Sequence, residues 1–179
     1  MLDFKQSYFD LFGLPEHFNI DESQLSSAFR ALQAKYHPDR FINADDQERR
    51  LALQTTGFIN EAHETLLSSR LRARYLLILN GIDFDDEIDT THDGAFLMHQ
   101  MEIREALEEV RDAHDPLARI DDIAQEISGE ADALKDDFVE KMEEGKLACA
   151  KDAVLKMKFF ERLCQESRRL TEELEDELF

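Results

Sequence analysis

The sequence has 179 residues and a formal net charge of −20, with 21 Lys and Arg against 41 Asp and Glu. Such a chain is repelled by nucleic-acid phosphates and by anionic lipid, which excludes a general nucleic-acid-binding or membrane-surface protein. The 42% hydrophobic content supports packed cores, whereas few stretches are rich in the residues that favour strands, so an all-α protein is predicted. No long apolar run and no cationic leader with an apolar core is present, and a soluble, cytoplasmic protein is expected.

The charge is distributed unevenly along the chain. Residues 1–80 contain 9 Lys and Arg and 11 Asp and Glu, whereas residues 81–179 contain 12 and 30. A change of this size, from a net charge of −2 to one of −18, indicates two modules with different roles.

Two helices are predicted at the N-terminal end. Residues 8–12 form a short helix, which the following Gly-Leu-Pro ends. The next helix begins at a cap, either Asp21 or Ser23, and continues along an apolar stripe to Tyr36. It must end there because Pro38 has no amide hydrogen and disfavours the α conformation of the residue before it.

Two further helices complete the first half of the chain. Asp45 caps a third helix, and a fourth covers residues 70–80, where Gly81 ends it. The side of the third helix that is predicted to be buried contains Leu51, Thr55, Phe58, Ile59, Ala62 and Leu66.

The tripeptide His37-Pro38-Asp39 lies between the second and third predicted helices. By itself it is typical of a plain turn. Its setting is more specific, because FRALQAKYHPDRF covers the end of the second helix and the loop, and INEAHETLLSSRLRARYLL covers the end of the third helix and the fourth helix. These segments resemble a J domain over residues 8–80, which implies a helical hairpin that binds a 70-kDa heat-shock chaperone and accelerates its ATP hydrolysis. The chaperone-binding residues implied by the resemblance are His37, Pro38, Asp39, Tyr36, Lys35, Arg30 and Arg40.

The chemistry of this loop suits such a role. Pro38 restricts the loop, so less conformational entropy is lost on docking. Asp39 offers a carboxylate that accepts two hydrogen bonds from a partner arginine. The second helix has only two cations, Arg30 and Lys35, whereas J domains carry a strongly basic helix at this place. That difference favours a specialised chaperone partner.

The second half predicts a linker and a three-helix bundle. Residues 81–94, GIDFDDEIDTTHDG, are acidic and lack a helical stripe, so they are interpreted as the linker. Helical patterns follow over residues 95–113, over residues 117–144 and from Gly145 to the C-terminus. Short connections between them favour antiparallel neighbours. The predicted organisation is therefore a J domain (1–80), a linker (81–94) and a three-helix bundle (95–179).

The first helix of the bundle has two apolar faces on a helical wheel. One is a core stripe of Phe96, Ile103, Leu107 and Val110. A solvated opposite face has no reason to hold three large apolar side chains, so it either binds a partner or packs against another part of the chain. It combines three apolar and three acidic residues, namely Leu97, Met98, Met101, Glu102, Glu105 and Glu109.

The segment FLMHQMEIREALEEV, which precedes two long helices, resembles the C-terminal domain of the HscB family of J-domain co-chaperones. The resemblance covers nearly the whole chain and implies a bacterial-type member, which stimulates an HscA-type chaperone and delivers to it the IscU-type iron–sulfur cluster scaffold. In the family, an aromatic residue on the last helix also contacts the scaffold, and the sequence leaves open which of Phe159 and Phe160 is exposed. The implied scaffold-binding residues are Leu97, Met98, Met101, Glu102, Glu105, Glu109 and Phe159.

Two other binding functions stay open: a J-domain co-chaperone with a different client, and a helical-bundle binding protein without chaperone activity. A di-iron enzyme would require Glu-x-x-His on two helices, and the sequence has no such motif. With no glycine-rich phosphate loop and no Cys/His group at zinc spacing, no enzyme activity, cofactor or metal site is expected. His99 is interpreted as solvated, and Cys149 and Cys164 as reduced core residues.

Overall fold

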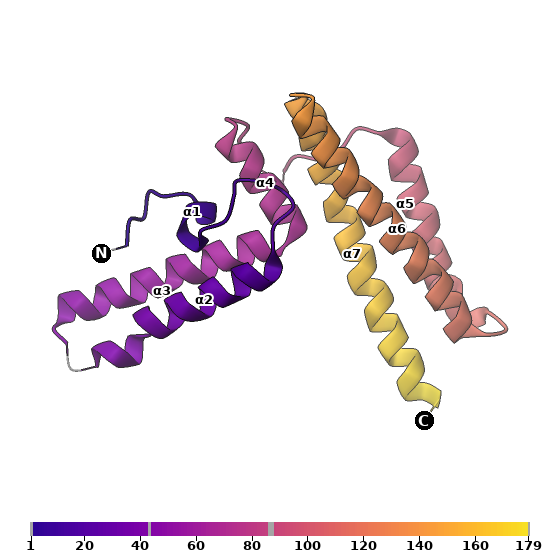
Figure 1. Cartoon of the computed structure of the whole chain (residues 1–179). Helices are drawn as coiled ribbons and strands as arrows, with labels where there is room; N and C mark the ends of the chain where they lie inside the picture. Colours follow the sequence, from indigo (N-terminus) through magenta and orange to yellow (C-terminus); the bar gives the residue numbers. More distant parts are fainter. Residues whose placement is uncertain (1, 43, 86–87, 179) are drawn as a thin grey trace. The chain divides into compact units, whose positions relative to one another are not determined.

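The computed structural model describes residues 2–42, 44–85 and 88–178 (Figure 1). Helices are the regular elements of this part of the chain, and no strand occurs in it, which confirms the all-α prediction. The chain divides into two compact units, Met1–Asn80 and Gly81–Phe179, each with a core of its own. None of the helices in the described ranges is both long enough and apolar enough to cross a membrane.

The first unit is built around an antiparallel hairpin of α2 and α3 (Figure 1). Its elements are α1 (Tyr8–Phe12), α2 (Glu22–Tyr36), the 3-10 turn η1 (Pro38–Phe41), α3 (Asp46–Leu67) and α4 (Ser69–Leu79). The helices begin and end where the caps predict. Asp21 Oδ1 accepts hydrogen bonds from the backbone N–H groups of Ser23 and Gln24 at 2.9 and 3.0 Å, so Asp21 is the cap of α2.

The core of the first unit lies between the hairpin and the short helices α1 and α4. Phe29 of α2 stacks on His63 of α3 with ring centroids 3.8 Å apart, and Gln33 donates a hydrogen bond to Asn60 at 2.8 Å. Burial of His63 lowers the pKa of its imidazole. The buried apolar side chains of this unit include Phe9, Phe12, Leu25, Ile59, Ala62, Leu66, Ala73 and Leu77.

The second unit is the predicted three-helix bundle, with α5 (Gly94–Glu108), α6 (Pro116–Glu143) and α7 (Leu147–Leu178) as neighbours (Figure 1). Pro116 occupies the first turn of α6, and Gly145, at φ 70°, allows the tight turn into α7. The predicted single helix over residues 95–113 differs at its end, because residues 109–112 tighten into a 3-10 turn, η2 (Glu109–Asp112). The core of the bundle contains Ile103, Leu107, Val110, Ile120, Ile123, Ile127, Phe160, Leu163 and Leu174.

The segment predicted as a linker, residues 81–94, packs on the bundle in its described part; Asp86 and Glu87 lie outside that part. The side chains of Phe84 and Thr91 are buried, and Lys151 of α7 lies over the Phe84 ring. Ion pairs of 2.7 Å from Asp89 to Lys151 and 2.8 Å from Asp93 to Lys156 hold the segment against α7. The hydrogen bond that Lys156 donates is the main reason why the pKa of the Asp93 carboxyl is lowered. Asp89 and Asp93 are therefore bound to the bundle, and the burial of Phe84 and Thr91 shows that the described part of the segment is not a free, solvated connection.

Candidate functional site

The loop between α2 and α3 presents an exposed carboxylate on a fixed backbone. The side chain of Asp39 is 79% exposed and that of His37 is 54% exposed. Pro38 opens η1, and His37 Nδ1 accepts a hydrogen bond of 3.3 Å from the backbone N–H of Asp39. Thr56 of α3 donates a hydrogen bond of 3.0 Å to the carbonyl oxygen of Tyr36. These bonds order the loop while its carboxylate faces solvent.

Two of the three predicted cations, Lys35 and Arg40, lie at this end of the hairpin. Arg40 bonds back to the end of α2, where its guanidinium donates to the carbonyl oxygen of Ala34 at 3.0 Å. Lys35 Nζ lies 5.1 Å from the centre of the Tyr36 ring. Arg30 is also exposed, but it lies about 140° around the helix from Lys35. The structure thus brings residues 35–40 together and leaves Arg30 on a different side of α2.

The second predicted site is the outer face of α5. Met98 is 67% exposed and Met101 is 55% exposed, while Leu97 is half-buried. Glu102 and Glu105 are exposed on the same helix. We call these five residues, together with Glu109 and Phe159, the α5 patch. The opposite stripe of α5 is buried in the bundle, so the face with the two methionines is not part of the unit's core.

Glu109 has a different setting from the other acidic residues of the α5 patch. Because α5 ends at Glu108, Glu109 lies in the 3-10 turn η2 and not on the regular helix face. It lines a shallow hollow with Ala106, Asp112, Ala113 and Arg119. The wheel, which assumes a continuous α-helix, misplaces this residue.

The two adjacent phenylalanines of α7 have different environments, which answers the question that the sequence left open. Phe160 is 1% exposed and belongs to the core, whereas Phe159 is half-buried at the surface. The ring of Phe159 meets that of Phe96 edge to face, with centroids 5.7 Å apart. Phe159 therefore lies beside the first turn of α5, next to the position where Leu97 begins the α5 patch. It also lines a hollow with Ile88, Asp89, Thr90, Leu155, Lys158 and Arg162.

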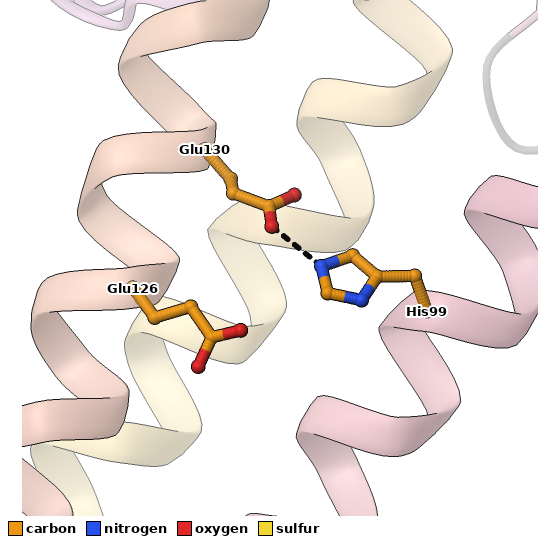
Figure 2. A group of neighbouring side chains, drawn as sticks. All are labelled: His99, Glu126 and Glu130. Atoms are coloured by element: carbon orange, nitrogen blue, oxygen red, sulfur yellow. Dashed lines mark hydrogen bonds and ion pairs between the residues drawn. The ribbon is translucent and has the colours of Figure 1, made fainter.

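His99 contradicts the expectation of a solvated histidine. Its Nε2 lies 2.5 Å from Glu130 Oε1 of α6, and its Nδ1 lies 3.6 Å from Glu102 Oε2 (Figure 2). The hydrogen bond to Glu130 is the largest cause that raises the pKa of the His99 imidazole. Sequence spacing gave no sign of this pair, because 31 residues separate the two groups. The antiparallel pairing of α5 and α6 would have indicated this contact. His99 and Glu130 lie about equally far along the chain from the connection between the two helices, so antiparallel pairing places them opposite each other.

The cysteines differ in part from their predicted burial. Cys149 is exposed, and Cys164 is half-buried with its pKa raised by burial. Position 149 follows Leu147, the first residue of α7, and lies on the outer side of that helix. The interpretation of both cysteines as core residues is therefore wrong for Cys149.

Comparison with known proteins gives the same two-part division of the chain. Residues 7–75 match the model of the DnaJ domain, and residues 92–168 match that of the HSCB C-terminal oligomerisation domain. The chain is 40% identical over 173 residues to a co-chaperone protein HscB homolog of Vibrio cholerae, covering 94% of this chain and 98% of the relative. It is 41% identical over 176 residues to the homolog of Shewanella loihica, covering 97% and 99%.

Solved structures agree with these sequence matches. The chaperone HscB from Vibrio cholerae matches with a TM-score of 0.86 and 37% identity, covering 97% of this chain and 100% of that one. The human co-chaperone protein HscB matches with a TM-score of 0.84 and 28% identity, covering 93% and 83%. The relatives are named as co-chaperones and not as enzymes. The fold, the exposed loop of the first unit and the matches along the chain together show that this protein belongs to the HscB family of J-domain co-chaperones.

Proposed function

We propose that this co-chaperone stimulates the ATPase of a specialised, HscA-type 70-kDa chaperone and delivers an IscU-type iron–sulfur cluster scaffold to it. The observation that carries the first half is the Asp39 carboxylate, 79% exposed on an ordered loop of a J domain. The exposed methionines of α5 support the second half.

The loop would act on the chaperone without doing chemistry itself. Asp39 accepts a bidentate hydrogen bond from an arginine of the chaperone and so favours one of its conformations. Hydrogen bonds from Thr56 and Arg40 already order the backbone around the loop, so little conformational entropy remains to be lost on docking. Lys35 and Arg40 add positive charge beside the carboxylate and would pair with acidic groups of the chaperone.

The α5 patch would hold the scaffold. Met98 and Met101 are flexible and apolar, so they adapt to the shape of a partner and bury surface on binding. Glu102 and Glu105 beside them favour a basic partner surface. Phe159 would extend the contact from α5 onto α7.

One chain that carries both sites raises the concentration of the scaffold at the chaperone. Stimulated hydrolysis would then retain the scaffold on the chaperone and assist the transfer of its cluster, which is the cargo of this reaction and not a cofactor of the co-chaperone.

Single-turnover ATP hydrolysis by the chaperone tests the first half of the proposal. We expect the intact protein to accelerate hydrolysis and Asp39→Asn to return the rate to its basal value, because the substitution removes the charge while keeping the size. Asp10→Asn, an equally conservative change at an exposed position of α1, is the matched control and should stimulate normally. Equal stimulation by Asp39→Asn and the intact protein would refute the role of the loop.

The second candidate function is that of a J-domain co-chaperone with a different client, because only the resemblance to the HscB family indicates that the client is the iron–sulfur scaffold. Calorimetric titration with the scaffold separates the two. Absence of binding, together with normal acceleration of hydrolysis, would favour the different client.

A further inference from the structure

Three groups with metal-binding chemistry lie together between α5 and α6. His99, Glu126 and Glu130 each place one ligand atom within 4.8 Å of the others. Among residues 2–42, 44–85 and 88–178, this is the one such group of three or more His, Cys, Asp or Glu side chains. Figure 2 shows the imidazole of α5 facing the carboxylates of α6.

The geometry follows from the helices. Glu126 and Glu130 are four residues apart, so they lie on the same face of α6 one turn from each other. His99 faces them from α5, with its Nε2 2.5 Å from Glu130 Oε1. The side chains of His99 and Glu130 are 36% and 38% exposed and Glu126 is exposed, so the group is open to ions. One imidazole nitrogen and two carboxylate oxygens suit a divalent transition-metal ion.

A second carboxylate contact orients the imidazole for this role. His99 Nδ1 lies 3.6 Å from Glu102 Oε2, one turn further along α5. Metal-bound histidines commonly direct their other ring nitrogen at a carboxylate, which fixes the tautomer and the orientation of the ring. Here the Nδ1–H would point toward Glu102, and the Nε2 lone pair would be directed toward α6.

We propose that His99, Glu126 and Glu130 bind a divalent first-row transition-metal ion, with His99 Nε2 and one oxygen of each glutamate as ligands and Glu102 as the orienting carboxylate. The ion takes the place of the hydrogen between His99 Nε2 and Glu130, and that proton is released to water, because a metal ion binds the unprotonated ring nitrogen. Water completes its coordination on the open side. The search for sequence motifs missed the site because its ligands come from two helices and not from one local spacing.

Titration of the full-length, tag-free and metal-free protein tests this site, with Zn²⁺ in a calorimeter and Co²⁺ followed by visible absorption. We expect one saturable ion per chain and the absorption bands of Co²⁺ with a nitrogen ligand. His99→Ala and Glu130→Gln should abolish binding of Zn²⁺, and Glu102→Gln should weaken it about 10- to 100-fold. Circular dichroism of each variant checks that the helices are intact.

Two matched control variants each remove one imidazole or one carboxylate outside the proposed metal site. His114→Ala takes away an exposed imidazole, and Glu108→Gln takes away an exposed carboxylate of α5; neither should change the Zn²⁺ affinity. The proposal is overturned if Zn²⁺ binding is not saturable, if His99→Ala binds as tightly as the intact protein, or if Mg²⁺ displaces Zn²⁺ at equal concentration. None of these readouts uses a chaperone or a scaffold, so the outcome is independent of the proposed function.

Discussion

Phe159 and Phe160 are identical neighbours on α7, yet their side chains have opposite surroundings. Phe160 fills the centre of the bundle, while Phe159 meets Phe96 at the surface. Helix geometry requires such a difference, because consecutive residues point about 100° apart. Which of the two faces the core depends on how α7 is rotated against α5 and α6, and this follows from the packing of the whole bundle.

The pair allows the roles of core and surface to be separated. We expect Phe160→Ala to lower the free energy of unfolding by about 3–5 kcal/mol, because it leaves a cavity in the core. Phe159→Ala should change that free energy much less and should weaken scaffold binding. Denaturant unfolding and calorimetric titration with the scaffold measure the two quantities. A large loss of stability in Phe159→Ala would show that this ring is structural.

His99 shows what a sequence pattern can miss at this scale. The hydrogen bond of His99 with Glu130 forms between two helices, and nothing about the neighbouring residues on α5 indicates that bond. The helical wheel grouped Leu97, Met98 and Met101 because these residues share one helix, whereas Phe159 of α7 was implied by the family resemblance alone.

At the scale of the element, α5 is a helix with two apolar faces that serve different purposes. Ile103 and Leu107 are buried in the bundle, whereas Met98 and Met101 stay at the surface. Folding of the bundle requires Ile103 and Leu107 in its core. It does not require Met98 and Met101, and polar residues at these two positions would make the helix more soluble.

Truncating the exposed face tests its role. We expect Met98→Ala combined with Met101→Ala to weaken scaffold affinity by about tenfold or more and to leave the basal stimulation of the chaperone intact. Calorimetry gives the affinity, and single-turnover hydrolysis gives the stimulation. Leu53→Ala, at a residue of α3 that is likewise large, apolar and exposed, is the control. Unchanged scaffold affinity in the double variant would refute the assignment of the client to this face.

The helix boundaries could be predicted because the signals that set them are local. Asp21 and Asp45 cap α2 and α3, Pro38 starts a new turn, and Gly13 and Gly145 adopt positive φ where helices end. These residues act on the few backbone groups around them. Their effect is therefore visible without knowledge of the fold.

Features that depend on distant contacts were not predictable in this way. The segment 81–94 has the composition of a linker, but Phe84 and Thr91 are buried, and Lys151 and Lys156 of α7 bind its carboxylates. The lysines lie about sixty residues further along the chain. The tightening of the chain at Glu109 likewise reflects the turn into α6 and not a breaker at that position.

At the scale of the whole molecule, the two units differ in net charge as well as in the family domain that each one matches. The first unit is nearly neutral and carries the J domain, whereas the second holds almost all of the excess negative charge. A strongly acidic surface repels other acidic proteins and attracts basic ones over distances of about 8–10 Å at moderate salt. The scaffold site that we propose on the second unit would therefore favour a basic partner surface.

Separating the units tests whether their covalent connection matters. Because each unit has its own core, we expect the fragments 1–80 and 81–179 to fold and to retain chaperone stimulation and scaffold binding, respectively. Mixed together at micromolar concentration, they should bring less scaffold to the chaperone than the intact chain does, since the connection supplies an effective concentration in the millimolar range. Equal amounts of scaffold retained on the chaperone with the mixture and with the intact chain would show that delivery does not depend on the connection.

The exposure of the two methionines has a chemical consequence of its own. Thioether sulfurs at the surface react with peroxide without any unfolding, and the sulfoxide product is polar and chiral where the side chain was apolar and adaptable. Under the proposed function, an oxidant would therefore weaken binding of the scaffold. It would not modify the loop of residues 35–40 that is proposed to bind the chaperone, because this loop contains no sulfur. Enzymatic reduction of the sulfoxides would reverse this effect, so the face of α5 that a partner can reach is also a face that oxidants can reach.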